Sequence, residues 1–144
     1  LNPCKEMIES VKNPIALHVR RTDYVTNSAN HPPCTLDYYK RALSYFETHR
    51  NVIVFSDDPA WCNEQELFSD ERFMISENDD NRIDLCLMSL CNDYIIANST
   101  FSWWGAWLSA NKDKKVIAPL QWFGTGYTKD HDTKDVTPDG WTRI

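Results

Sequence analysis

The stretch that decides the fold is IALHV at residues 15–19, which runs directly into RRTDY at residues 20–24. A short, mostly apolar run of this kind is typical of a strand that is buried on both faces, as in a parallel sheet. Similar runs predict four further strands, at residues 52–55, 73–75, 94–97 and 116–118.

Helical patterns separate these runs, and each pattern follows a residue that can cap a helix. The predicted helices cover residues 36–50, 60–68, 80 or 81 to 91, and 101–111. Their caps are Thr35, Asp58, Asp80 or Asn81, and Ser99 or Thr100. Strands and helices that alternate in this way predict an α/β fold with an open, Rossmann-like parallel sheet. No linker or repeat interrupts the chain, so residues 1–144 are predicted to form a single domain.

The composition is that of a globular domain. The 144 residues are 42% hydrophobic and 25% charged, and the net charge of −6 argues against a nucleic-acid-binding protein. No apolar run approaches the roughly 20 residues that span a bilayer. The five cysteines form no CxxC pair, and their odd number favours a reducing compartment over a disulfide framework. The chain begins with Leu1 rather than Met, which suggests a piece of a longer protein.

The first candidate site lies at the carboxyl end of the strand at residues 15–19, where open α/β sheets place their ligand crevice. Alternation along a strand puts His18 and Arg20 on one face and Arg21 on the other. The planar fork of an arginine matches the oxygens of a phosphate, and Asp23 could orient the neighbouring guanidinium. The alternative is a structural salt bridge among these charges, which are common where strands end.

The second candidate is NSTFSWWG at residues 98–105, which follows a predicted strand and opens a predicted helix. The first amides of a helix are unpaired donors that favour an anion. Three hydroxyls stand beside these amides, on Ser99, Thr100 and Ser102. Since one hydroxyl suffices for a cap, both the phosphate interpretation and the capping interpretation stay open.

Two carboxylates complete the set of candidates. Asp57 comes just after the strand at residues 52–55, at the same edge as Arg20, and could hold a ligand or an arginine. Asp84 lies near the start of a predicted helix, and a carboxylate can accept two parallel N–H bonds from a guanine edge. The alternative for Asp84 is a favourable charge at a helix N-terminus.

Three further patterns are not taken as sites. The tryptophans Trp103, Trp104 and Trp107 are predicted to pack against the fold rather than to stack on a sugar. The glycosylation sequon at residues 98–100 is discounted, because the strand-to-helix turn that carries it is expected to be buried. The acidic pattern at residues 130–132 is not assigned to a metal, because it lies in an irregular tail.

Taken together, three motifs resemble the α-1,2-fucosyltransferases of glycosyltransferase family 11. They are HVRRTDY at residues 18–24, FSDDP at 55–59 and NSTFSWWGAWL at 98–108. Their order and spacing match, and the resemblance runs from about Ile15 to Phe123. The last motif is the most distinctive, because HxRRxD also occurs in α-1,6- and protein O-fucosyltransferases. Thr22 is a departure, since the family often has Gly at that position.

The resemblance implies the donor-binding domain of a GT-B-type enzyme that lacks its N-terminal half. Such an enzyme transfers L-fucose from GDP-fucose to the 2-hydroxyl of a galactoside, with inversion and without a metal or other cofactor. Arg20 would be the main contact to the β-phosphate, and Asp23 is the other catalytic candidate. Besides Arg20, the candidate donor-binding residues are His18, Arg21, Asp57, Asp84, Asn98, Ser99, Thr100, Phe101 and Ser102.

Two alternatives stay open. Thr22 favours an α-1,6- or protein O-fucosyltransferase. A noncatalytic nucleotide-sugar or carbohydrate-binding module is the other, because residues 25–28 lack the glutamate that related α-1,6 enzymes have there. The expected partners are GDP-fucose and a galactose-terminated glycan, and peripheral membrane association stays open. The expected location is the cytoplasm for a bacterial source, which is favoured, and the Golgi lumen for a eukaryotic one.

Overall fold

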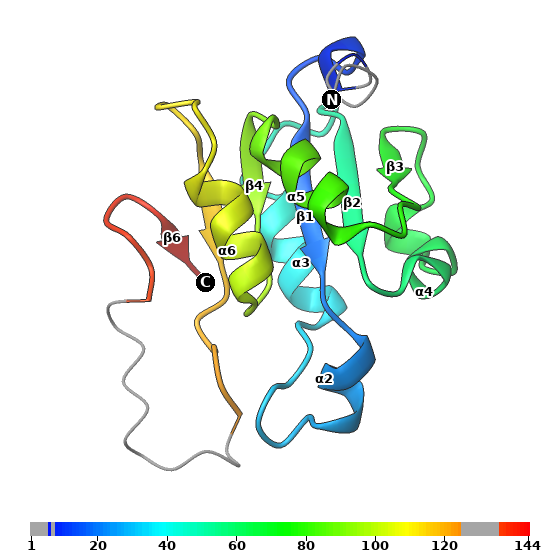
Figure 1. Ribbon diagram of the computed structural model, residues 1–144, viewed down its shortest axis with the longest axis vertical. Coiled ribbons are helices and arrows are strands. Elements are labelled where there is room, and N and C mark those ends of the chain that lie inside the picture. Colours follow the sequence, from blue (N-terminus) through cyan, green and yellow to red (C-terminus); the bar gives the residue numbers. More distant parts are fainter. Residues whose placement is uncertain (1–5, 7, 125–135) are drawn as a thin grey trace.

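The computed structural model describes residues 6, 8–124 and 136–144. Within them a six-stranded sheet has the order β3-β2-β1-β4-β5-β6, and every pairing is parallel (Figure 1). The strands are β1 (Ile15–Val19), β2 (Val52–Ser56), β3 (Phe73–Ile75), β4 (Asp93–Ile95), β5 (Val116–Ala118) and β6 (Thr142–Arg143). The predicted α/β fold with an open, Rossmann-like parallel sheet is confirmed.

Five α-helices and a short 3-10 helix connect the strands in the described residues. They are α2 (Thr22–Thr26), α3 (Leu36–Leu43), α4 (Pro59–Asn63), η1 (Glu66–Phe68), α5 (Asn81–Ser89) and α6 (Thr100–Trp107). The four predicted caps are confirmed, because a side-chain oxygen of each accepts a backbone N–H of the first turn. The residues are Thr35, Asp58, Asp80 and Ser99.

The predicted helix ends are less accurate than the predicted starts. The helix expected over residues 36–50 ends at Leu43, where a run of poor helix formers begins. The segment expected over 60–68 splits into α4 and η1, and α6 ends at Trp107 rather than at residue 111. No helix of the described part is both long and apolar enough to cross a membrane.

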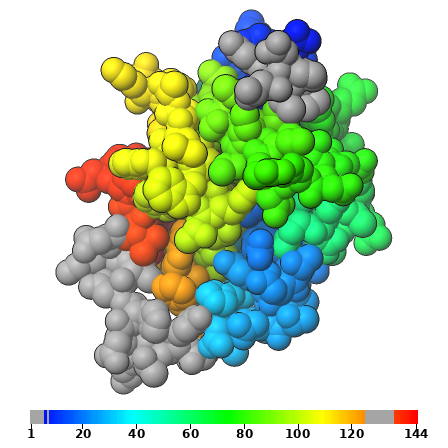
Figure 2. All heavy atoms as spheres, in the orientation of Figure 1, coloured from blue at the N-terminus to red at the C-terminus, as the bar shows by residue number. Residues whose placement is uncertain are grey.

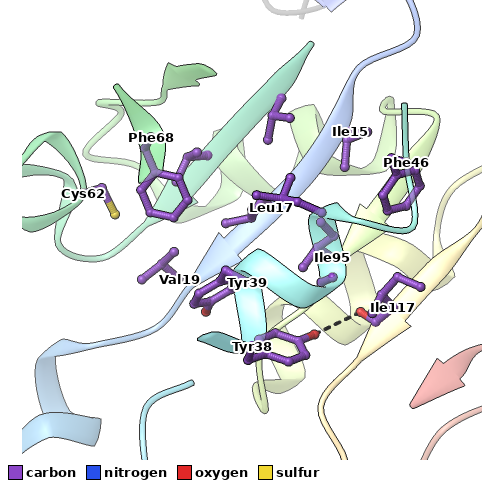
Figure 3. Close-up of a cluster of buried hydrophobic side chains, with 14 residues drawn as sticks. Ile15, Leu17, Val19, Tyr38, Tyr39, Phe46, Cys62, Phe68, Ile95 and Ile117 are labelled. Atoms are coloured by element: carbon purple, nitrogen blue, oxygen red, sulfur yellow. Dashed lines mark hydrogen bonds between the residues drawn. The ribbon is translucent and has the colours of Figure 1, made fainter. Parts of the chain in front are cut away.

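Two hydrophobic layers cover the two faces of the sheet. Ile15, Leu17 and Val19 alternate onto the face that α3 covers, where they pack with Tyr38 and Tyr39 (Figure 3). The intervening positions point to the opposite face, which α5 and α6 cover (Figure 1). This alternation sends the side chain of His18 toward the α5 and α6 side.

The strand order reverses between β1 and β4. The chain winds outward from β1 through β2 to β3, and then returns to place β4 on the other side of β1. Open α/β sheets bind ligands at such a reversal, outside the carboxyl ends of the strands. Residues 20–24 follow β1 and residues 98–102 follow β4, so the two motifs lie at the same point of the sheet.

Candidate functional site

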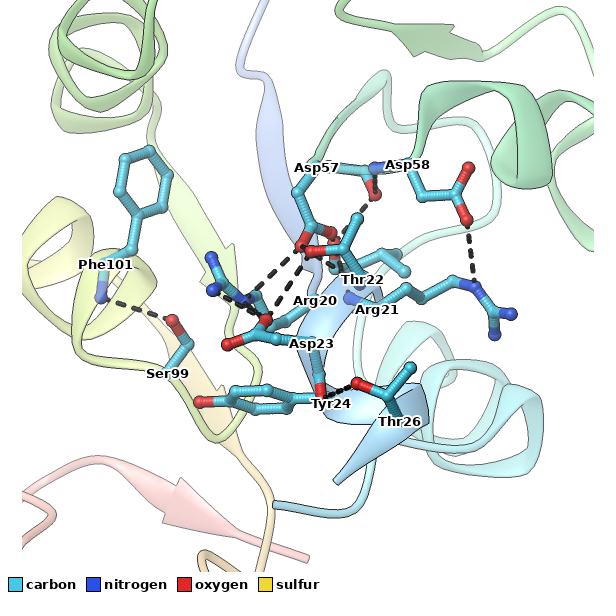
Figure 4. Close-up of polar contacts among 12 residues, drawn as sticks. Arg20, Arg21, Thr22, Asp23, Tyr24, Thr26, Asp57, Asp58, Ser99 and Phe101 are labelled. Carbon is cyan, nitrogen blue, oxygen red and sulfur yellow. Dashed lines mark hydrogen bonds and ion pairs between the residues drawn. The ribbon is translucent and has the colours of Figure 1, made fainter. Parts of the chain in front are cut away.

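Arg20 presents one edge of its guanidinium to carboxylates. Its Nη2 donates to Asp23 Oδ1 at 2.8 Å, and its Nε donates to the same oxygen at 3.1 Å. The Nε also lies 3.4 Å from Asp57 Oδ2. Within the described residues Nη1 makes no hydrogen bond, and Figure 4 shows the guanidinium pointing toward the start of α6, where Ser99 and Phe101 lie. The unused edge is therefore the one available to an anion.

Asp57 holds the start of α2. Its Oδ1 accepts the N–H of Arg21 at 2.9 Å, and its Oδ2 accepts the N–H of Thr22 at 3.1 Å. The Thr22 hydroxyl also donates to Oδ2, at 2.6 Å. Both carboxylate oxygens thus accept hydrogen bonds from the start of α2, and the Nε of Arg20, at 3.4 Å, is the arginine contact that the sequence allowed for Asp57.

Arg21 points away from Arg20, as strand alternation predicts (Figure 4). Its Nε lies 3.4 Å from Asp58 Oδ2, and its guanidinium carbon lies 3.9 Å from the ring centroid of Trp61. Asp58 also caps α4 by accepting the N–H of Trp61. Arg21 thus links the start of α2 to α4, and the structure does not place its guanidinium beside that of Arg20.

His18 is buried and neutral at the end of β1. The residue is only 3% exposed, and its Nδ1 has no hydrogen-bond partner among the residues that the structure describes. Desolvation by burial lowers its pKa to about 4; the Asp57 carboxylate opposes this shift, and the Arg20 guanidinium adds to it. The imidazole lies 5.2 Å from the ring of Phe101 at the start of α6. A buried nitrogen without a partner is costly, and a bound ligand could satisfy it.

The predicted anion motif divides into structural and exposed residues. Asn98 is buried, and its amide nitrogen donates to the carbonyls of Pro32 and Trp122. Ser102 is buried too, and its hydroxyl oxygen accepts the N–H of Ala97, which follows β4. Asn98 is therefore buried, as expected for the strand-to-helix turn that carries the sequon.

Ser99 and Thr100 stand at the helix start itself. Ser99 caps α6 by accepting the N–H of Phe101 at 3.3 Å, whereas Thr100 is exposed. The structure thus places Ser99, Thr100 and Phe101 at the start of α6, beside the carboxyl end of β1, while the side chains of Asn98 and Ser102 support this turn from within.

Tyr24 is a site residue to which the sequence assigned no role. Its hydroxyl donates to the Asn98 carbonyl at 2.8 Å, and its ring lies 5.3 Å from the guanidinium carbon of Arg20. It therefore joins α2 to the turn before α6. Its place within the HVRRTDY motif could have marked Tyr24 as a site residue, but no local sequence pattern indicates a hydrogen-bond partner 74 residues away.

Asp84 forms a second polar group, on α5. Its Oδ1 accepts the Ser76 hydroxyl at 2.9 Å and the Asn78 amide at 3.2 Å. Burial raises its pKa, which these two hydrogen bonds oppose, and the charge of Asp80 adds to the rise. Ser76 and Asn78 also line a cavity of about 220 Å³. No hydrogen bond links this group to Arg20 in the described residues.

The tryptophans of α6 differ in burial. Trp103 packs into the core and its indole N–H donates to the Val136 carbonyl. Trp104 and Trp107 contact Trp103, yet they are 48% and 51% exposed, and α6 lies on the surface in Figure 2. The packing prediction is confirmed for Trp103, and its two neighbours pack on Trp103 while staying about half exposed.

Within residues 6, 8–124 and 136–144, no group of three or more His, Cys, Asp or Glu residues could hold a metal ion. The acidic pattern at residues 130–132 lies outside the described residues.

Comparison with known proteins identifies the family. Residues 4–144 match the model of glycosyl transferase family 11. The chain is 38% identical over 97% of its length to the O-antigen biosynthesis glycosyltransferase WbnK of Escherichia coli, covering 47% of that protein. It is 37% identical, again over 97% of its length, to an alpha-1,2-colitosyltransferase of Escherichia coli, covering 51% of it.

A third relative is more distant. The galactoside 2-alpha-L-fucosyltransferase SEC1 of Bos taurus is 29% identical over 66% of this chain and 28% of that protein. No solved structure gives a significant match. The chain spans about half the length of the two bacterial relatives. From the family match over nearly its whole length, the chain belongs to glycosyl transferase family 11.

Proposed function

We propose that this chain is the donor-binding domain of a GT-B-type α-1,2-fucosyltransferase that uses GDP-fucose. The reaction transfers L-fucose to the 2-hydroxyl of a galactoside, inverts the anomeric centre and needs no metal ion. Membership of family 11 supports the reaction class, and the names of the colitosyl and fucosyl relatives support the α-1,2 linkage.

One observation carries the proposal: the unused edge of Arg20 faces the start of α6 across the point where the strand order reverses. Departure of GDP builds negative charge on the β-phosphate. An arginine fork and helix-end N–H groups, fixed in advance, stabilise that charge more in the transition state than in the ground state. Ser99, Thr100 and the Nδ1 of His18 would supply further hydrogen bonds to the donor.

Asp84 is the proposed guanine acceptor. Guanine offers two adjacent N–H donors, and a carboxylate can accept both in parallel. Ser76 and Asn78 hold Oδ1 of Asp84 in place, and Oδ2 accepts no hydrogen bond from any described residue. Recognition of that edge would distinguish GDP from ADP, because adenine presents a different donor and acceptor pattern.

Asp23 is the proposed base toward the acceptor hydroxyl. Although desolvation favours its protonated form, the Arg20 guanidinium and hydrogen bonds outweigh it and leave the pKa of Asp23 below its ordinary value. The carboxylate is therefore ionised at neutral pH and able to accept a proton, although its pairing with Arg20 makes it a weak base.

Calorimetric titration with GDP tests the donor site. We expect GDP to bind more tightly than ADP, and Arg20→Ala to weaken GDP binding by about 2 kcal/mol, or roughly 30-fold. Arg72→Ala is the matched control, since it also removes one positive charge but at the opposite edge of the sheet, just before β3. Equal affinity of wild type and Arg20→Ala would refute the role given to Arg20.

The colitosyl relative favours a second donor. This relative is 37% identical to the chain, and its name supports a donor whose sugar, colitose, lacks the 3-hydroxyl of fucose. Competition between GDP-fucose and the GDP-linked 3-deoxy sugar, followed by linkage analysis of the product, decides among donors and linkages. A 1,6-linked sugar or a fucosylated protein hydroxyl would support the other fucosyltransferase classes. Binding without transfer by a chain of the relatives' full length would support a noncatalytic module.

A further inference from the structure

Thr22 makes a contact that its position in the motif does not reveal. Its hydroxyl donates to Asp57 Oδ2 at 2.6 Å, the shortest of the three bonds that the carboxylate accepts from α2 and the residue before it. The same oxygen lies 3.4 Å from Nε of Arg20. One carboxylate oxygen thus joins the threonine to the arginine proposed to bind phosphate.

Packing does not hold α2 in place. None of its five residues is buried, so apolar contacts contribute little to its position. Its first N–H groups would be unpaired at the helix start, and Asp57 is the acceptor that meets them. The position of α2 therefore depends on polar contacts, which are those with Asp57 and the bond from the Tyr24 hydroxyl to the Asn98 carbonyl. Arg20 depends on them too, because it bonds to Asp23 on α2 and lies beside Asp57.

We propose that Thr22 is a positioning residue, which acts through Asp57 to hold Arg20 with its free edge toward the donor diphosphate. This inference rests on the proposed function. Three donors fix the plane of the Asp57 carboxylate, so Nε of Arg20 meets an oxygen of fixed direction. Without the hydroxyl, Oδ2 loses a donor and the Asp57 carboxylate can turn, so it no longer holds the Arg20 guanidinium in one position. Binding of the diphosphate must then order the long side chain of Arg20, and this loss of conformational entropy weakens the binding.

The test compares three variants of the 144-residue chain by calorimetric titration with GDP. Thr22→Val keeps the shape and the backbone N–H but removes the hydroxyl, and we expect it to weaken GDP binding by about tenfold. Thr22→Ser keeps the hydroxyl and should restore affinity close to that of wild type. Thr26→Val is the matched control, because Thr26 lies on the same helix and its hydroxyl donates only to the Asp23 carbonyl.

A double-mutant cycle separates positioning from a general loss of structure. If Thr22 acts through Arg20, Thr22→Val should have no further effect on GDP affinity in an Arg20→Ala background. Thermal unfolding midpoints of all variants should match that of wild type. The inference fails if Thr22→Val binds GDP as wild type does, or if its effect persists without Arg20. Failure of the wild-type chain to bind GDP would instead refute the proposed function.

Discussion

At the scale of single residues, burial decides which titratable groups carry charge. His18 stands among charged neighbours, yet it is neutral because desolvation outweighs the attraction of Asp57. Asp23, two residues after Arg21, stays ionised beside Arg20. A neutral imidazole can donate or accept a hydrogen bond without adding charge, so Arg20 supplies the positive charge of the site.

We predict that burial of His18 makes the protein less stable in acid. Its pKa in the folded chain, about 4, lies below the ordinary value of 6.5, so between these pH values the unfolded chain binds a proton at His18 and the folded chain does not. Its contribution is fully present above pH 6.5 and declines toward pH 4. We expect this contribution to be about 3 kcal/mol in the free energy of unfolding.

Urea titrations of wild type and His18→Gln between these pH values measure that contribution. The variant keeps every other titratable group, so the difference between the two pH profiles isolates His18. Parallel profiles would mean that His18 takes up its proton equally in the folded and unfolded chains.

At the scale of elements, the contact between α5 and α6 is tight at Gly105. A Cβ added at Gly105 would lie 3.1 Å from Cβ of Met88. The small residue lets the two helices approach closely on the sheet face that carries the site. Their packing therefore fixes where α6 begins, and with it the position of Ser99 and Thr100.

Substitution at Gly105 should show this tight contact. Gly105→Val is expected to destabilise the protein by about 2 kcal/mol, because a Cβ there already lies 3.1 Å from Met88 and two methyl groups would add to this contact. Gly105→Ala is the matched control and should change stability by less than about 1 kcal/mol, since its gain in helix propensity offsets a small shift of Met88. Chemical denaturation measures both, and equal stability of the two variants would contradict the tight packing.

At the scale of the whole molecule, a net charge of −6 coexists with a proposed anion site. The local field is set by the Arg20 edge and the start of α6, which meet at the carboxyl end of β1 and β4 (Figure 4). The strand order provides this meeting point on one edge of the sheet. An acceptor must approach the donor from a second surface, and the bacterial relatives are about twice as long as this chain.

The 144-residue chain should therefore bind the nucleotide without completing the reaction. We expect calorimetry to detect GDP binding, and mass spectrometry to detect no fucose on a β-galactoside incubated with the chain and GDP-fucose. A protein of the relatives' full length that contains this domain should produce the fucosylated product. Transfer by the 144-residue chain alone would show that the acceptor site lies within it.

The sequence by itself determined the features that depend on near neighbours. The apolar runs at residues 15–19, 73–75 and 116–118 are strands with the predicted bounds. The first and the last are buried on both faces, which requires consecutive apolar side chains, whereas β3 at the edge of the sheet is only partly buried. The helix caps Thr35, Asp58, Asp80 and Ser99 are equally local, since each bonds an N–H two or three residues ahead.

Only the tertiary structure decided which candidate residues meet and what each one does. α2 was not predicted, because its first N–H groups bond to Asp57, 35 or more residues away. β6 has only two residues and exists through its pairing with β5. Asp57 accepts hydrogen bonds from the start of α2, and the Asn98 amide donates to the loop at Pro32. Arg20 uses only its Nε and Nη2 edge within the described residues, which leaves Nη1 available. A sequence pattern records local spacing, whereas these roles depend on distances set by the packing of the whole sheet.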